Sequence, residues 1–458
     1  MLVIISDLHL TDGTSGETIR EGAFRVFRER LRDAAYDASW RRDGTYKPLE
    51  QIDVILLGDI LDVIRSTRWL AGPVRPWDNP QGGPFVDRIR EVNDAILKNN
   101  AASLGILKSL DDTQAVTIPP ATAAGKPAGV SRDPGATDRV PVKVKLHYMV
   151  GNHDWFYHLP GAAYDEIRKS VVAAAGLAND PGAPFPHDPS ESPAIQQALV
   201  DHRVFARHGD IFDSFNFDHD RNRSSLGDAI VIELLNRFPQ EVARQLGGDL
   251  SAECQAGLKE IDNVRPLIVV PVWVNGLLQM TCGDPGTIQK VKGIWDKLAD
   301  DFMGLNFVRT HSSTLDLFDD VDRLEWALKF SRGVSLAHLS HLLTWIKEKF
   351  LARDESYFKF ALNEQAFKNR SARYIVYGHT HHYEIVPLDA AVMPSGILNQ
   401  IYINSGTWRA VHELAQAHPE EQEFLGYKVM TYLSFYREDE RGGQPFETWT
   451  GSLAGQQV

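Results

Sequence analysis

The chain has 458 residues, which is long enough for one large domain with insertions or for two domains. Its formal net charge is −13 at pH 7. Because contacts along nucleic acid need clustered Lys and Arg, we expect no extended nucleic acid as a partner. No apolar run reaches about 18 residues, so we expect no transmembrane segment. No basic segment precedes the first apolar run, which predicts a first strand instead of a signal peptide, and hence a cytoplasmic protein.

Runs of apolar residues predict β-strands, and the earlier runs are apolar without alternation, as strands covered on both faces are. The predicted strands are residues 2–5, 54–57, 146–150, 204–207, 374–377, 384–387, 401–403 and 429–436. Between the first two strands, residues 17–42 place apolar side chains on one stripe and Arg and Glu opposite, which predicts an amphipathic helix. A strand, a helix and a strand in succession predict an α/β core.

Side chains that bind metals stand directly after several of these strands. They are Asp7, His9, Asp59, Asn152, His208, His379 and His381. Oxygen and imidazole ligands without sulfur suit Mn²⁺, Fe, Zn²⁺ or Co²⁺ better than Ca²⁺. The set is large enough for two divalent transition metals, with manganese as our first expectation. Two-metal sites are suited to the hydrolysis of phosphate esters, so the sequence predicts an enzyme, a metal-dependent phosphoesterase.

The position of these side chains suggests how they share the metals. Asp7 and His9 are two residues apart at a strand end, so both can face one cation as the chain turns. Asp59 can bridge two cations with its two carboxylate oxygens. His153 follows Asn152 directly and could protonate the leaving oxygen as a general acid.

Residues 224–369 differ from the rest because helical spacing dominates there. We expect helices at residues 226–238, 266–280, 289–302, 315–330, 336–351 and 357–367. This block stands between His208 and His379, which must both reach the metals, so it must leave the core and return. We therefore predict a core of residues 1–223 and 370–458 and an inserted helical cap of residues 224–369. The apolar cap suggests a confined pocket for a small phosphoester substrate, and peripheral contact with a membrane is also open. The sequence does not determine the oligomeric state.

The chain resembles the calcineurin-like metallophosphoesterase superfamily. The family motifs D-x-H, G-D-x-x-D, G-N-H-[DE], an isolated His before Gly, and G-H-x-H occur in order at residues 7–9, 58–62, 151–154, 208–209 and 378–381. The resemblance covers roughly residues 1–220 and 370–440. It implies two packed mixed β-sheets flanked by helices, that is, a four-layer αββα sandwich. It also implies in-line attack on phosphorus by a metal-bridging hydroxide.

The resemblance implies a role for each residue at a motif position. Metal one would be bound by Asp7, His9, Asp59 and His381, and metal two by Asp59, Asn152, His208 and His379. Asp62 stands where the family places the carboxylate that orients the catalytic histidine, which corresponds to His153 here.

Five further residues are candidates for substrate binding. Arg207, Arg221 and Arg223 flank the His208 segment and could bind a phosphate, although solvent-exposed positions are equally open for the last two. Trp408 and Arg409 follow a late strand, where a turn close to the metals would bring them to the substrate.

Two features bear on the choice among phosphoesterases. Eukaryotic-type Ser/Thr phosphatases extend the second motif to G-D-x-x-D-R-G, whereas Val63 and Ile64 follow Asp62 here, so protein phosphatase activity of that type is not expected. His208, its following Gly-Asp and the helical insertion resemble UDP-diacylglucosamine pyrophosphatases, although that branch carries Arg at the position of His153. Hydrolysis of a lipid-linked or nucleotide diphosphate is therefore an alternative to a phosphatase or phosphodiesterase. A nuclease and an inactive binding module are further alternatives, which the acidic charge and the complete ligand set, respectively, argue against.

Overall fold

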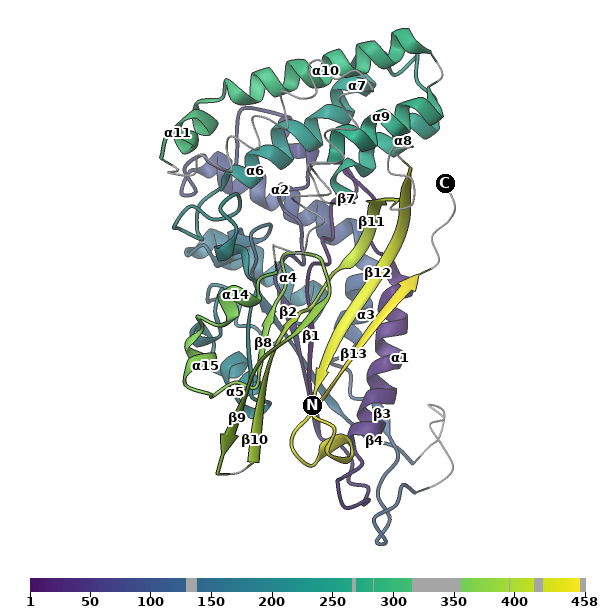
Figure 1. Ribbon diagram of the computed structural model, residues 1–458, viewed down its shortest axis with the longest axis vertical. Coiled ribbons are helices and arrows are strands. Elements are labelled where there is room, and N and C mark those ends of the chain that lie inside the picture. The colour runs from purple at the N-terminus through teal and green to yellow at the C-terminus, as the bar shows by residue number, and fades with distance from the viewer. Residues whose placement is uncertain are drawn as a thin grey trace.

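The computed structural model describes residues 1–128, 138–265, 269–282, 284–314, 356–394, 396–415 and 423–453. In these residues the chain forms mixed β-sheets flanked by helices (Figure 1). No described helix combines the length and the hydropathy needed to cross a bilayer.

The larger sheet has seven strands. Its order is β5 (Lys143–Met149), β2 (Gln51–Leu57), β1 (Leu2–Ile5), β12 (Phe424–Phe435), β11 (Trp408–Leu414) and β7 (Val264–Arg265), and β13 (Phe446–Leu453) also pairs with β12. Strands β5, β2 and β1 run parallel, whereas β12 is antiparallel to β1. The parallel strands therefore all end at the same edge of the sheet.

The smaller sheet has four strands in the order β6 (Val204–Arg207), β8 (Tyr374–Tyr377), β10 (Gly396–Asn404) and β9 (Glu384–Met393). Strands β6, β8 and β10 are parallel, and β9 returns antiparallel beside β10. A short separate ladder joins β3 (Thr117–Ile118) to β4 (Val140–Pro141).

An apolar core joins the two sheets. It includes Leu2 and Ile4 of β1, Ile55 of β2, Val204 of β6 and Val376 of β8, all of them buried. The larger core lies on the opposite face of the seven-stranded sheet, where helices cover it. These helices include α1 (Glu21–Ala38), α2 (Gly83–Asn99), α3 (Ala101–Ser109) and α4 (Ala162–Ala175). Helix α5 (Pro193–Asp201) contributes to the core between the sheets. Strands β1 and β2 of the larger sheet are thus covered on both faces, which explains why they are apolar at consecutive positions.

Helix α1 confirms the predicted amphipathic helix, with shorter ends. Its buried side chains are Ala23, Phe24, Phe27, Leu31, Ala34, Ala35 and Ala38. They recur at intervals of three and four residues and therefore form one stripe along the helix.

Most of the described part of residues 224–314 is helical, and Figure 1 shows these helices gathered at one end of the molecule. They are α6 (Leu226–Ile230), a π-helical turn (Val231–Asn236), α7 (Arg237–Leu246), α8 (Ala252–Lys259), α9 (Val270–Thr281), α10 (Pro285–Met303) and α11 (Asn306–Thr314). The helices predicted at residues 226–238 and 289–302 are confirmed. Between α8 and α9, β7 joins the larger sheet beside β11, so this segment is tied to the sheet by backbone hydrogen bonds.

The end of the predicted cap is described only in part. The helices predicted at residues 315–330 and 336–351 lie outside the described residues. The helix predicted at residues 357–367 is instead two short helices, α14 (Phe358–Ala361) and α15 (Gln365–Lys368). Ala361 packs with Tyr377 and Tyr402 of the smaller sheet, in a core cluster that contains no residue of α6–α11. The division into a core and a cap stays a prediction.

Candidate metal centre

The predicted ligands converge where β1, β2, β5, β6 and β8 end. The loops after these strands carry His and Asp side chains in overlapping groups whose ligand atoms lie within 4.8 Å of one another. The groups are Asp7, His9, Asp59 and His381; His9, Asp62 and His153; and Asp59, His208 and His379. These buried groups could hold a metal ion.

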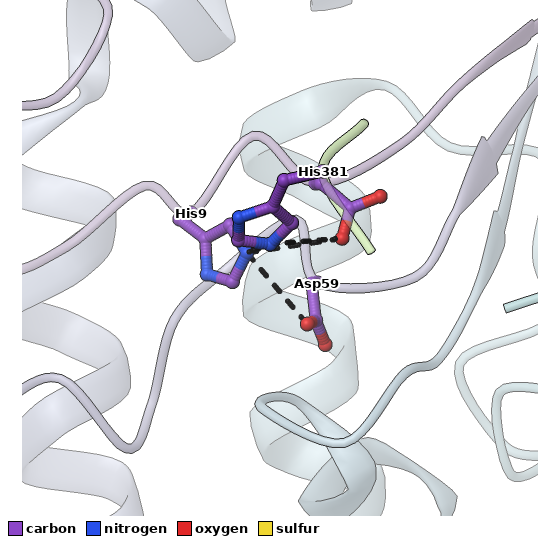
Figure 2. A group of neighbouring side chains, drawn as sticks. His9, Asp59 and His381 are labelled. Carbon is purple, nitrogen blue, oxygen red and sulfur yellow. Dashed lines mark hydrogen bonds and ion pairs between the residues drawn. The ribbon is translucent and has the colours of Figure 1, made fainter. Parts of the chain in front are cut away.

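The first group is formed by loops after β1, β2 and β8 (Figure 2). The Nε2 atoms of His9 and His381 are 2.9 Å apart. His9 Nε2 lies 3.7 Å from Asp59 Oδ2, and His381 Nε2 lies 3.3 Å from Asp7 Oδ1. Four potential ligand atoms therefore face one small volume, although the residues are separated by up to 374 positions in the chain.

The second group shares Asp59 with the first. His208 Nε2 lies 3.2 Å from Asp59 Oδ2 and 3.2 Å from Asn152 Oδ1. His379 Nδ1 lies 3.0 Å from the same Asn152 oxygen. Asn152 thus joins this group, as the sequence predicts, and Asp59 stands between the two groups.

The backbone at the centre adopts an uncommon conformation. Positive φ angles occur at Asp7 (54°), His9 (44°), Asp59 (54°), His379 (68°) and His381 (61°). Non-glycine residues rarely adopt positive φ, and such strain tends to occur at functional sites. Here it turns successive side chains of one loop toward the same point.

Two motif glycines allow the backbone to approach the side chains of the centre. A Cβ at Gly58, which has φ of +84°, would lie 2.4 Å from His208 Nδ1. A Cβ at Gly151 would lie 2.4 Å from Asp59 Oδ1 and 2.7 Å from His208 Nε2. Any larger residue would displace His208 or Asp59, so both positions require glycine.

The chemistry of the centre fits a cation. Asp7 Oδ1 is buried and makes no hydrogen bond of acceptable geometry. The facing Nε2 atoms of His9 and His381 form a hydrogen bond when one of them carries a proton, and both can act as ligands when a cation lies between them. Burial raises the pKa of Asp59, but the charges of His208 and His153 outweigh burial and keep the pKa below its ordinary value. The carboxylate of Asp59 is therefore ionised and available to a cation.

Asp62 holds two imidazoles at once. Its Oδ1 lies 2.8 Å from His153 Nδ1, as expected, and its Oδ2 lies 2.6 Å from His9 Nδ1. Burial lowers the pKa of His153, but the charges of Asp62 and Asp59 outweigh it and raise the pKa to about 9. A pKa of about 9 favours the protonated imidazole of His153 at neutral pH. Its backbone N–H also donates to Asp59 Oδ1 at 2.9 Å.

Two contacts of the centre were not predicted. Asp213 Oδ2 lies 3.0 Å from His379 Nε2 and fixes that ring from the side opposite Asn152. Asp213 stands five residues after His208 in the same loop, and this spacing could have identified it as a candidate site residue from the sequence. Arg265 donates to His381 Nδ1, with Nη2 at 3.0 Å. Its place in the helical segment, far from any motif, carried no signal.

The predicted substrate-binding residues are mostly engaged elsewhere. Arg207 pairs with Asp188 and Glu364, Arg221 with Asp210, and Arg223 with Asp220. None of these described ion pairs includes a residue of the centre.

Two of these predictions do not fit the structure. Trp408 is fully buried, packs against Phe24 and Phe27, and donates through Nε1 to a backbone carbonyl, so it belongs to the core and does not line the site. Arg409 is also buried and is bound by Asp262 and Asn263. The segment that we expected to be a turn begins β11, whose alternate residues must face the core.

No protein-family model matches this chain, and no curated protein matches it either.

Proposed function

We propose that the protein is a binuclear metal-dependent phosphoesterase of the calcineurin-like kind. The observation that carries this proposal is the position of Asp59, which belongs to both groups of ligand atoms. A carboxylate shared between two such groups can hold two cations side by side, and adjacent cations are suited to phosphoryl transfer to water.

The proposal assigns each group to one cation. Asp7, His9, Asp59 and His381 would hold the first, and Asp59, Asn152, His208 and His379 the second. Two divalent cations, when bound, supply an activated water and stabilise charge on the phosphoryl oxygens. Ligands with mixed nitrogen and oxygen atoms favour Mn²⁺, Fe, Zn²⁺ or Co²⁺, with Mn²⁺ as the first to test.

The side chains around the cations have supporting roles in this proposal. His153 would donate the proton that the leaving oxygen needs, and Asp62 would orient it through the 2.8 Å contact with Nδ1. Asp62 would also fix the His9 ring, because its second oxygen faces His9 Nδ1 at 2.6 Å. Carboxylates commonly orient metal-binding histidines in this way.

The architecture supports the proposed kinship. The two mixed sheets share a core, and helices cover the outer face of the larger sheet. This arrangement is compatible with the family's four-layer sandwich, and the ligands lie on loops at the ends of parallel strands. A small phosphoester is the proposed substrate, with monoesters and diesters both open.

The experiment combines metal analysis with a substrate panel. The purified protein is reconstituted with Mn²⁺ and analysed for metal per chain. It is then assayed with p-nitrophenyl phosphate, bis-p-nitrophenyl phosphate, cyclic nucleotides and a UDP-sugar lipid. We expect two metals per chain and metal-dependent hydrolysis of at least one ester. Less than one metal per chain, or no hydrolysis of any ester by the loaded protein, would contradict the proposal.

A further inference from the structure

A cluster of arginines lies beside the candidate metal centre. The buried carboxylate of Asp262 binds Arg65 and lies 3.2 Å from Arg409 Nη2. Asn263 Oδ1 also accepts from Arg409 Nε at 3.1 Å. One carboxylate thus serves these two guanidinium groups, and the third arginine of the cluster, Arg265, must find other partners.

Arg265 has a partner pattern unlike that of its neighbours. Its Nη1 donates to the backbone carbonyls of Asp262 and Val264, both at 2.8 Å. Among the ion pairs of the described residues, none includes Arg265. No carboxylate of the described residues lies within ion-pair distance of this guanidinium, although the side chain is partly buried in strand β7 and the charge of Asp262 acts on it from farther away.

The Nε–Nη2 edge of the Arg265 guanidinium points at the candidate metal centre. Nε and Nη2 both donate to His381 Nδ1, at 3.3 and 3.0 Å. The same ring places Nε2 only 2.9 Å from His9 Nε2, inside the first ligand group. The Nε–Nη2 edge is the one with which arginine binds two oxygens of a phosphate at once.

The contact with His381 conflicts with metal binding by that ring. A histidine that binds a cation through Nε2 carries its proton on Nδ1 and needs an acceptor there. Arg265 offers Nδ1 only donors. The two arrangements exclude each other. When a cation binds His381 Nε2, the Nε–Nη2 edge of Arg265 must turn away from His381. The bonds from Arg265 Nη1 to the two backbone carbonyls can remain.

We propose that Arg265 binds the phosphoryl oxygens of the substrate through Nε and Nη2, next to the first metal. This inference rests on the proposed phosphoesterase function and makes the arginine cluster its anion-binding side. Arg65 and Arg409 lie beside it at Asp262 and add positive charge to this side of the centre. The assignment adds a substrate contact from the helical segment, outside every motif of the strand loops.

The test compares Arg265→Gln and Arg265→Lys with the wild-type, Mn²⁺-loaded protein. The probe is inorganic phosphate, whose affinity is measured by calorimetry and as a competitive inhibition constant. Metal content and thermal unfolding are measured in parallel. The matched control is Arg244→Gln, which removes an exposed arginine of the helical segment that pairs with Glu241.

We expect Arg265→Gln to weaken phosphate binding roughly 10–100-fold, the scale of one lost charge-assisted bidentate contact. KM should rise by a similar factor while both metals remain. Arg265→Lys should restore part of the affinity, because it keeps the charge but not the two-donor edge. Arg244→Gln should behave as the wild type.

Other outcomes would overturn the inference in distinguishable ways. If wild type hydrolyses esters and Arg265→Gln binds phosphate as tightly, Arg265 is not a phosphate contact. If Arg265→Gln instead loses a metal, the residue positions His381 and does not bind substrate. If wild type itself takes up no metal, the proposed function fails first, and this assignment falls with it.

Discussion

Two neighbouring regions of this molecule bury charge in opposite ways. In the strand loops, carboxylates and imidazoles gather so that acceptors exceed donors, and Asp7 Oδ1 is left without a hydrogen bond. In the arginine cluster, two guanidinium groups contact the carboxylate of Asp262 and a third, that of Arg265, contacts its backbone carbonyl, so donors exceed acceptors. Buried charge is costly unless it is compensated. The first region therefore suits cations and the second suits an anion, as a centre that holds a metal-bound phosphate would.

The largest expected effect comes from removing the side chain that joins the two ligand groups. Asp59→Asn should lose metal and lower turnover by roughly 10³-fold or more, because metals supply several kcal/mol of charge stabilisation. His208→Ala should act in the same way. Metal analysis and steady-state kinetics check both variants.

The control for this pair is His382→Ala, which removes an exposed histidine next to His381. It should keep metal content and turnover. Near wild-type turnover with full metal in Asp59→Asn would show that the strand-loop cluster is not the catalytic centre.

The next effect separates proton donation from metal binding. His153→Ala should keep both metals while turnover falls by roughly 10²–10⁴, the range for a lost general acid. The loss should be smaller for nitrophenyl esters, whose leaving group needs no proton. Equal losses for alkyl and nitrophenyl esters would remove the acid role.

Asp62→Asn sharpens the same distinction. A carboxylate that only orients His153 would give a milder version of the His153→Ala phenotype. Because Asp62 also faces His9 Nδ1 at 2.6 Å, we expect a weakened affinity for metal by about 10–100-fold in addition. Metal titration of Asp62→Asn and His153→Ala side by side measures this difference.

The arginine cluster can be broken through its carboxylate. Asp262→Asn should lower the free energy of unfolding by about 3–5 kcal/mol, because it leaves buried guanidinium groups without a counter-charge. Burial raises the pKa of Asp262, but the charges of Arg65 and Arg409 outweigh burial and keep the pKa below its ordinary value. Urea unfolding at neutral pH is the measurement. Asp220→Asn, from an exposed pair with Arg223, should change stability by less than about 1 kcal/mol. Equal stability of Asp262→Asn and Asp220→Asn would show that the Asp262 carboxylate does not stabilise the arginine cluster.

The smallest effect concerns a buried histidine that serves neither cluster. His202 stands at the end of β6 opposite His208, and its Nδ1 lies 2.7 Å from the carbonyl of Ala198. Burial lowers the pKa of His202 to about 4. The unfolded chain takes up the proton near pH 6.5, so this contribution to stability is complete above that pH and is lost as the pH falls toward 4.

The loss should amount to about 1–3 kcal/mol between those pH values. Unfolding by urea at a series of pH values measures it, with His202→Gln for comparison. If His202→Gln showed the same decline on acidification, other groups would account for it.

The sequence by itself determined much of the centre. Asp7, Asp59, His208 and His379 each follow directly on a buried apolar strand, and neighbouring parallel strands end at one edge of a sheet. Order along the chain therefore translates into nearness in space. The strands β1, β6 and β8 were predicted with their observed bounds, because strands covered on both faces are apolar at consecutive positions.

Only the tertiary structure decided the rest. Trp408 follows the late strand β10 as a surface turn would, yet it is buried beneath α1, because β11 starts there and pairs with β12. Arg265 meets His381 across 116 positions of the chain. Such contacts depend on how helices and sheets pack, and side-chain spacing within one segment carries no information about partners on another. Local pattern sets where a strand ends, whereas packing of the whole chain sets which charges meet there.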